Sequence, residues 1–270
     1  MKKKTALNNL KEKLDELYIC YNRKKFVHPD PLEFLYDYKD IKDRELVALI
    51  ASSLAYGRVA QILKSVSIVL KIMSPSPYNF LTDISEKDLL KRFKGFKHRF
   101  TTGEDISLML LGAKRMIGEE GSMYNAFLSG YNNTDENIIP ALSRFTERLN
   151  DVSVQEKNSL ISLPCRGSAC KRHHLFLRWM VRKDAVDPGG WDMIDPAKLI
   201  IPLDTHMHKL GTGMNMTVRK QADMRTAIEI TGAFRKINPE DPVRYDFSLT
   251  RLGIRKDGDP ASFINSLRNI

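Results

Sequence analysis

Two segments decide how the rest of this chain is interpreted: GSACKRHHLFLRWMVRKD at Gly167–Asp184 and IIPLDTHMHKLG at Ile200–Gly211. The first contains Lys171, and the second contains Asp204, which follows it by 33 residues. We interpret the residues before these segments as a helical scaffold. The residues after them are predicted to form helices that close over the same site. We expect the amine of Lys171 and the carboxylate of Asp204 to meet at the mouth of a cleft.

The residues just before Lys171 predict a turn followed by a helix. Gly167 can adopt a positive φ there, and Ser168 can cap the helix that follows. Lys171 then falls in the first helical turn, where unpaired backbone N–H groups and the positive end of the helix dipole lie together. This environment disfavours a charged ammonium, and desolvation would favour the neutral, nucleophilic amine. The same N–H groups suit a phosphate. Further positive charge along this helix is predicted from Arg172, Arg178 and Arg182.

Asp204 follows an apolar run, so the chain is expected to reach it from the protein interior. It precedes a predicted helix over Thr205–Leu210, where an aspartate at the N-cap is stabilised in its ionised form. A capping role and a catalytic role are compatible, because the cap fixes the position of the side chain. Taken singly, Lys171 also suits a solvated surface lysine, and Asp204 also suits a cap with no catalytic function.

The histidines beside Asp204 leave a metal site open as an alternative. His206 and His208 form a His-x-His pair, and zinc would need a further ligand, such as His173 or His174. Residues two apart on a helix point in different directions, so joint ligation would require a strand. We therefore predict no metal and no other cofactor.

The amino-acid composition limits the possible fold classes and cellular compartments. The chain has 270 residues, of which 42% are hydrophobic, which suits one large domain or two lobes. Apolar residues recur at helical spacing and no long strand-like alternation is present, so an all-α fold is predicted. We expect one lobe over 43–150 and another from 1–42 with 151–270. No apolar run reaches the about 18–20 residues that span a bilayer. The three cysteines form no Cys-x-x-Cys pair, which fits a reducing cytoplasm without an iron–sulfur cluster.

Charge indicates a polyanionic partner. Lys plus Arg is 43 and Asp plus Glu is 33, giving a formal net charge of +10, and nucleic acid is the commonest polyanion that basic proteins bind. The segment Lys91–Phe100, KRFKGFKHRF, alternates cations with phenylalanines. Such a strip can hold a phosphodiester backbone while its rings stack on bases. The alternative is an amphipathic segment whose phenylalanines belong to the core.

The segment LDTHMHKL at Leu203–Leu210 resembles the Asp-Thr-His stretch of the endonuclease III class of helix-hairpin-helix DNA glycosylases. The lysine segment KRHHLFLRWM, with a long insertion before the aspartate, is more similar to the archaeal 8-oxoguanine glycosylase branch. The whole chain also resembles a widespread bacterial family with GSACKR, LFLRWMVR, PLDTH and DPVRYDF-type motifs. The resemblance runs from about Asp43 onward and is sharpest between Gly167 and Leu210.

This resemblance implies a two-lobed helical fold that binds double-stranded DNA with a damaged base, 8-oxoguanine being one candidate, and flips the base into a pocket. Lys171 would attack C1′ and cleave the strand through a Schiff base, and Asp204 would stabilise positive charge on the sugar. The implied DNA-binding residues are Arg166, Gly167, Ser168, Arg172, Tyr56 and Arg58, and the implied pocket residues are Trp191 and His206. No obligate protein partner and no membrane are implied, and the location would be the cytoplasm, with the nucleoid.

The chain departs from the glycosylase pattern at three places. The hairpin signature Leu-Pro-Gly-x-Gly reads Leu-Pro-Cys-Arg-Gly at 163–167, and the four-cysteine cluster is absent. At the position where glycosylases of this class have a glutamine that fills the gap left by the flipped base, this chain has Tyr56. Tyr56 either intercalates or packs within the helices. Two other functions therefore stay open: a DNA-binding relative without catalysis, and a metal-dependent hydrolase that uses His206 and His208.

Overall fold

The computed structural model describes residues 2–151, 158–254 and 259–268. The protein is predominantly helical, which confirms the predicted all-α class. The α-helices are α1 (Lys2–Tyr21), α2 (Ile41–Ser53), α3 (Val59–Ile72), α4 (Pro77–Asp83), α5 (Glu86–Arg92), α6 (Gly103–Glu120), α7 (Met123–Leu128), α8 (Ile139–Asn150), α9 (Lys171–Val181), α10 (Thr205–Gly213), α11 (Met224–Ile237), α12 (Asp246–Ile254) and α13 (Pro260–Arg268). Short 3-10 helices occupy Lys24–Phe26, Pro31–Asp37, Pro164–Arg166 and Pro196–Lys198. Two short strands, β1 (Lys97–His98) and β2 (Thr101–Thr102), form an antiparallel hairpin.

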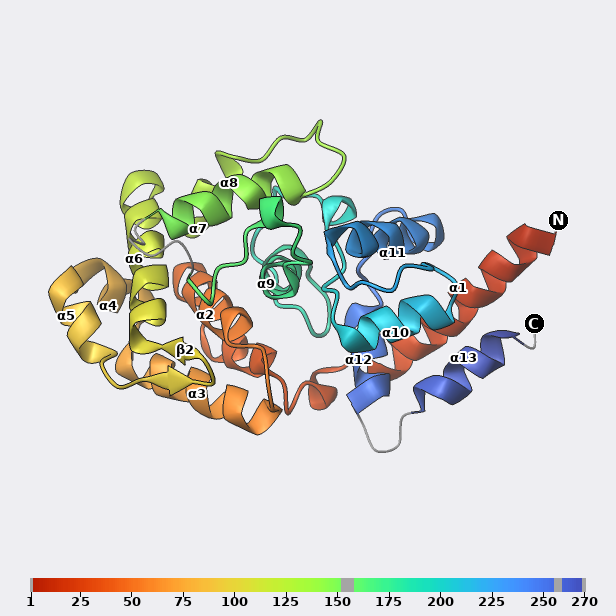
Figure 1. The fold of residues 1–270 in the computed structure, drawn as a ribbon, viewed down its shortest axis with the longest axis horizontal. Helices are drawn as coiled ribbons and strands as arrows, with labels where there is room; N and C mark the ends of the chain where they lie inside the picture. The colour runs from red at the N-terminus through yellow and green to blue at the C-terminus, as the bar shows by residue number, and fades with distance from the viewer. Residues whose placement is uncertain (1, 152–157, 255–258, 269–270) are drawn as a thin grey trace.

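The helices gather on either side of α9 (Figure 1). Helices α2 to α8 lie toward one end of the molecule, and α1 with α10 to α13 lies toward the other. Helix α9 packs against α2, while α10 packs against α12, and α12 against α1. A continuous cluster of buried apolar residues runs through both groups. The central helix α9 therefore carries its side chains where the two groups meet. No helix in the described part of the chain combines the length and apolarity that crossing a bilayer requires.

The boundary between α2 and α3 follows the sequence signals. Gly57 has a φ of 96° and separates the two helices, as its position predicts. The N-cap of α2 is Asp40, whose side chain accepts the N–H of Lys42. Asp43, an equally good capping residue by type, instead accepts hydrogen bonds from Ser76 Oγ and Tyr78 N at the start of α4. The side chain of Asp43 therefore joins two helices instead of capping one.

The helix predicted over Thr205–Leu210 extends further and includes two glycines. Gly211 and Gly213 both belong to α10. A Cβ at Gly211 would lie 2.6 Å from Ile230 Cδ1, and a Cβ at Gly213 would lie 2.5 Å from Ile264 Cδ1. These glycines allow close contact with α11 and α13. Glycine at these positions therefore reflects close helix packing and not a helix end at Leu210.

Candidate active site

The turn before α9 has the conformation that the sequence predicts at Gly167. Its φ is 76°, and its N–H donates to the carbonyl of Pro164 to close a 3-10 turn. The predicted cap is wrong: Cys170, with a φ of 45°, is the N-cap of α9 and makes no side-chain capping hydrogen bond. Ser168 Oγ accepts the N–H of Cys170, one step before the helix. Gly167 and Ser168 are both exposed at this turn.

Lys171 and Asp204 come together at the starts of two helices. Lys171 is the first residue of α9, and Asp204 is the N-cap of α10. Lys171 Nζ lies 3.1 Å from Asp204 Oδ2, with the side chains 33% and 26% exposed. Asp204 Oδ1 accepts the N–H groups of His206 at 2.9 Å and Met207 at 2.8 Å. The cap fixes the carboxylate, and the amine contacts the oxygen that the cap leaves open.

The charge state of Asp204 follows from these contacts. Burial disfavours the ionised carboxylate, but the neighbouring Lys171 ammonium and the N–H of Met207 outweigh it, and the pKa of Asp204 is lowered overall. The carboxylate is therefore negatively charged at neutral pH. An ionised carboxylate can accept a proton from the amine or stabilise a nearby cation.

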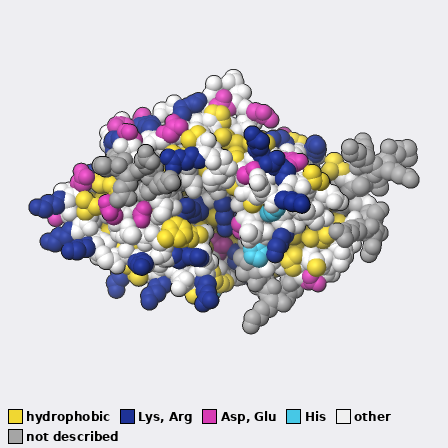
Figure 2. All heavy atoms as spheres, in the orientation of Figure 1, with side chains coloured by type: hydrophobic (Ala, Val, Ile, Leu, Met, Phe, Trp, Pro, Cys, Tyr) yellow, Lys and Arg dark blue, Asp and Glu magenta, His cyan; other side chains and the backbone are white. Residues whose placement is uncertain are grey.

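Both side chains line a cavity of about 340 Å³. The apolar part of its wall is formed by Pro31, Tyr56, Leu175, Trp179, Pro202 and Phe247, among others. His206, which is exposed, also lines it, in agreement with its predicted place beside the site. Figure 2 shows a recess at the centre of this face in which acidic and basic atoms are visible. A cavity with flat apolar walls and a few charged groups suits a small aromatic ring.

One face of α9 supplies much of this wall. Lys171, Leu175, Arg178 and Trp179 all line the cavity. They are separated by four, seven and eight positions from Lys171, the spacing of a single helical face. This periodicity was available in the sequence, and it places Trp179 on the same helix face as Lys171.

Trp191, which the sequence analysis assigned to the base pocket, lies in the core. Its side chain is 0% exposed and stacks on Tyr124 with ring centroids 5.4 Å apart. Its Nε1 donates to Glu45 Oε1 at 3.0 Å. The backbone N–H of Trp191 donates to Met180 at the end of α9, so the insertion folds back onto the core. The predicted pocket role of Trp191 was therefore wrong.

Arg172 is a structural residue and not an exposed phosphate ligand. Its guanidinium donates to the carbonyls of Ser53 at 2.9 Å and Ser159 at 2.8 Å, and lies over the ring of Tyr56. Tyr56 is itself half-buried, and its hydroxyl contacts His98 O at 2.9 Å and Thr101 Oγ1 at 2.7 Å. These contacts fix Tyr56 as a wall of the cavity. Arg172 supports that wall from behind, which corrects its predicted contact with DNA.

The two other arginines implied to contact DNA lie at the surface. Arg58 is exposed and precedes α3, between the cavity-lining residues Gly57 and Val59. Arg166 is exposed in the turn that ends at Gly167. Arg58 and Arg166 thus supply one exposed cation each, from two chain segments near Lys171.

The strip Lys91–Phe100 divides between core and surface. Phe93 is 0% exposed, whereas Phe100 is 63% exposed and its ring stacks on Tyr56 with centroids 4.9 Å apart. Phe93 therefore belongs to the core, as one alternative predicts, and Phe100 lies at the surface, as the other requires. The last aromatic ring of the segment lies on the outside of the cavity wall.

The histidines do not converge. His206 lines the cavity, whereas His208 Nε2 contacts the carbonyl of Arg219. His173 and His174 are buried in α9, and burial lowers the pKa of each to about 3. In the described residues no group of three or more His, Cys, Asp and Glu side chains could hold a metal ion. The divergence of His206 and His208 removes the pair on which the hydrolase alternative depends.

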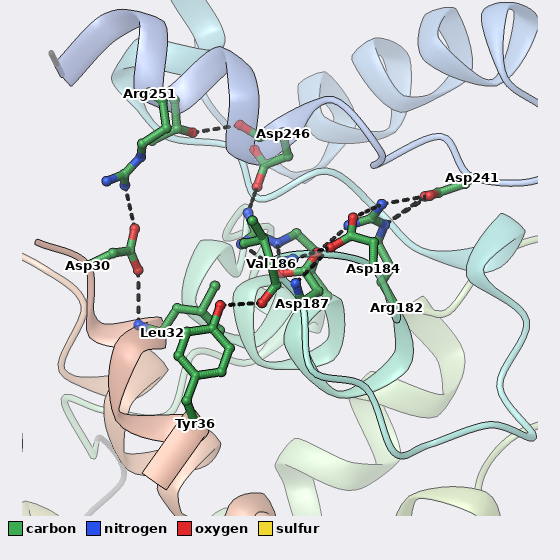
Figure 3. Close-up of polar contacts among 12 residues, drawn as sticks. Asp30, Leu32, Tyr36, Arg182, Asp184, Val186, Asp187, Asp241, Asp246 and Arg251 are labelled. Carbon is green, nitrogen blue, oxygen red and sulfur yellow. Dashed lines mark hydrogen bonds and ion pairs between the residues drawn. The ribbon is translucent and has the colours of Figure 1, made fainter. Parts of the chain in front are cut away.

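Sequence reasoning missed a buried network of charges behind the cavity (Figure 3). Arg178 and Arg182 are each 4% exposed and share Asp187, which is 0% exposed. Arg178 also pairs with Asp246, and Arg182 also pairs with Asp184 and Asp241. These two arginines therefore add no surface charge along α9, contrary to the prediction. Their carboxylates come from residues far apart in the sequence, which no local pattern reveals.

Asp246 connects this network to the cavity. It is 2% exposed, lines the cavity and receives Arg178 on Oδ2. Within the described residues no donor contacts its Oδ1. Burial raises the pKa of Asp246 to about 6, against the opposing effect of Arg178. The cavity therefore presents a hydrogen-bond acceptor to whatever enters it.

Comparisons with known proteins place the chain in a family. Neither the curated proteins nor the solved structures gave a match. A family model described as "Protein of unknown function (DUF2400)" matches residues 30–255, which include every cavity-lining residue except Pro29. The chain belongs to this DUF2400 family.

Proposed function

We propose that the protein is a DNA glycosylase with associated lyase activity that removes a damaged base from double-stranded DNA. The observation that carries the proposal is the 3.1 Å contact between Lys171 Nζ and Asp204 Oδ2 at the edge of a cavity of about 340 Å³. A primary amine beside an ionised carboxylate is suited to attack on an electrophilic carbon. The cavity lies within the range of small-ligand pockets, about 300–1,000 Å³.

The first step exchanges one bond at the sugar for another. The damaged base leaves the stack and enters the cavity. Asp204 Oδ2 accepts a proton from the Lys171 ammonium and passes it to the departing base, which leaves a neutral amine and an ionised carboxylate. Nζ then bonds to C1′ while the N-glycosidic bond breaks, and the electron pair of that bond leaves with the base. Positive charge develops on the sugar in the transition state, where the negative field of Asp204 stabilises it.

The second step cleaves the strand. The new secondary ammonium gives a proton to Asp204 Oδ2, and its nitrogen lone pair then breaks the C1′–O4′ bond. O4′ takes that proton, and the resulting imine is the Schiff base. Loss of a proton from C2′ then breaks the C3′–O bond, and the phosphate is the leaving group. Water hydrolyses the imine and restores the Lys171 amine. The reaction requires no metal or redox cofactor.

Duplex DNA would approach the face that carries the turn before α9. Gly167 and Ser168 are exposed there, and Ser168 can offer its backbone N–H to a phosphate, since the N–H of Gly167 already donates to Pro164 O. Arg58 and Arg166 supply exposed positive charge beside the cavity. The formal net charge of +10 favours association with the duplex. This proposal places the protein in the cytoplasm with the chromosome.

Borohydride trapping tests the chemistry directly. Labelled duplexes with 8-oxoguanine, uracil, an alkylated base or an abasic site would be incubated with the protein and reduced, because reduction makes a Schiff base permanent. We expect a covalent adduct with wild-type protein and none with Lys171→Gln or Asp204→Asn. Lys209→Gln, which removes an exposed lysine of α10, is the matched control and should trap normally.

The other outcomes reject the proposal. An adduct that persists in Lys171→Gln would assign the nucleophile elsewhere. DNA binding with no adduct and no base release would support a binding protein without catalysis. Absence of duplex binding at low salt would exclude both functions.

A further inference from the structure

A second surface adjoins the cavity, along α3 and the hairpin of β1 and β2. Two neighbouring grooves of about 230 and 410 Å³ lie there and share Lys64, Ile68 and Lys97 in their walls. Both are open, and Ile68 is 42% exposed between them. We call this surface, from Phe100 along both grooves, the hairpin groove. The proposed glycosylase chemistry does not use it.

The hairpin groove is strongly basic. Exposed cations line it: Lys64, Arg92, Lys94, Lys97 and Arg99. Within the described residues no acidic side chain pairs with any of the five. Lys and Arg side chains gather over this end of the molecule, where α3 and α5 lie (Figure 2). Unpaired cations along a groove attract a polyanion that can follow it.

An aromatic ring stands at the end of the groove that adjoins the cavity. Phe100 is 63% exposed, and its ring lies on Tyr56 at an interplanar angle of 26°. One face of Phe100 is thus covered, and the other is available to solvent. Tyr56 also lines the cavity, so the stacked pair forms the partition between the cavity and the groove. A flat ring held in this way is a platform for stacking a nucleobase.

The platform is held rigidly. Tyr56 contacts Thr101, and the ring of His98 bridges Tyr56 O at 3.0 Å and Ser65 Oγ at 2.9 Å. Arg99 crosses close to Gly57, where a Cβ would lie only 2.8 Å from Arg99 Cδ. Glycine at position 57 thus permits the approach that brings Arg99 to the Tyr56 ring, 5.9 Å from its centroid. Little ordering would be needed when a ligand binds.

We infer that the hairpin groove binds a single-stranded stretch of nucleic acid, with one base stacked on Phe100 and the phosphates along the five cations. In a duplex, the faces of the bases are covered by their neighbours, whereas an unpaired base can place its face on Phe100. The inference rests on the proposed function only for the identity of the nucleic acid, which would be DNA. In that case, the strand whose flipped base fills the cavity would continue, unpaired, across Phe100.

Equilibrium binding by fluorescence anisotropy tests this surface without catalysis. The probes are undamaged single-stranded DNA, the matching RNA, duplex DNA, and heparin as a polyanion without bases. For single strands, the logarithm of affinity falls with slope about −0.7 per phosphate contacted, so five contacts predict a slope of about −3.5. Lys97→Gln should reduce that slope by about 0.7. Lys13→Gln on α1, at the far end of the molecule, is the matched control and should leave it unchanged.

Substitution of Phe100 separates stacking from charge. Phe100→Leu keeps an apolar side chain but removes the ring, and should weaken single-strand binding about 5- to 100-fold with the salt slope unchanged. Phe100→Tyr should restore binding. Heparin binding should be the same for all three proteins. The relative affinities for DNA and RNA identify which single strand is preferred, and tight binding of either supports the inference.

Two results would overturn the inference. Unchanged single-strand affinity in Phe100→Leu would reduce the surface to a simple basic patch. Tighter binding of duplex than of single strands, with the Phe100 effect confined to the duplex, would indicate insertion between base pairs. The proposed function is judged separately, because these probes need no Schiff base. If Phe100→Leu loses single-strand binding and the wild-type protein forms no trapped adduct, the inference about the groove stands and the proposed glycosylase activity is rejected.

Discussion

Lys171 and the cap of α10 use different carboxylate oxygens of Asp204: Oδ2 lies 3.1 Å from the ammonium, while Oδ1 caps α10. The two functions can therefore be separated by mutation. Asparagine caps about as well as aspartate, so we expect Asp204→Asn to change the free energy of unfolding by less than about 0.5 kcal/mol. Asp204→Ala should lose about 1–2 kcal/mol with the cap.

Urea denaturation and adduct trapping, performed on both variants, check this separation. Both should fail to form the adduct, because neither has an anionic oxygen opposite Lys171. Equal destabilisation of the two variants would show that the ion pair, and not the cap, stabilises the start of α10.

Asp187 should be among the most sensitive positions for stability. It is 0% exposed and neutralises both Arg178 and Arg182, which are 4% exposed (Figure 3). Asp187→Asn removes the fully buried carboxylate that both guanidiniums share, and we expect a loss of about 3–5 kcal/mol. The control is Glu16→Gln, which breaks an exposed pair with Lys13 and should cost less than about 0.5 kcal/mol. Similar losses for both variants in urea would contradict this account.

Two glycines of α6 should respond oppositely to alanine. A Cβ at Gly112 would lie 2.1 Å from the Leu149 carbonyl oxygen of α8, whereas a Cβ at Gly118 would meet nothing within 4 Å. Gly112→Ala must move backbone atoms, and we expect a loss of about 1–3 kcal/mol. Gly118→Ala should gain about 0.5–1 kcal/mol from helix propensity. Thermal unfolding of the pair measures both, and a stable Gly112→Ala protein would show that α6 and α8 separate easily.

Glu45 should make stability depend on pH. Burial raises the pKa of Glu45 from 4.5 to about 7, although hydrogen bonds from Trp191 and Met123 oppose the shift. The folded state then holds a proton that the unfolded state has released between these values. The contribution of Glu45 to the free energy of unfolding is therefore present below pH 4.5 and declines as pH rises to about 7, by about 3 kcal/mol in total.

Comparison of wild type with Glu45→Gln isolates this contribution. Between pH 4.5 and pH 8, wild type should lose about 3 kcal/mol of free energy of unfolding relative to Glu45→Gln. The emission of Trp191, whose indole nitrogen bonds to Glu45, should change over the same range in wild type and remain constant in the variant. A pH-independent difference would show that Glu45 stays ionised when buried.

Much of the candidate site was predictable from local signals. The positive φ of Gly167, the helix with Lys171 in its first turn and the capping role of Asp204 all follow from neighbouring residues, whereas the predicted cap at Ser168 was wrong. Each depends on backbone groups within four residues, and those are fixed by the local sequence. The meeting of Lys171 with Asp204 was expected from motif resemblance and not from such signals.

The environment of individual side chains required the tertiary structure. The sequence favoured Trp191 for the cavity, yet Trp179 lines it and Trp191 bonds to Glu45 in the core. Both are tryptophans near the same helix. Which ring meets the cavity depends on how the residues after α9 fold back, and that is decided by packing against α2 and α7.

The sequence by itself determined an all-helical chain, the position of most helices and the capping role of Asp204, because periodicity and capping act over a few residues. The tertiary structure alone decided which charges face water. Arg58 and Arg99 are exposed, whereas Arg178 and Arg182 are buried beside Asp187. A guanidinium has the same intrinsic charge in all four places, but its desolvation and neutralisation depend on carboxylates brought from distant parts of the chain.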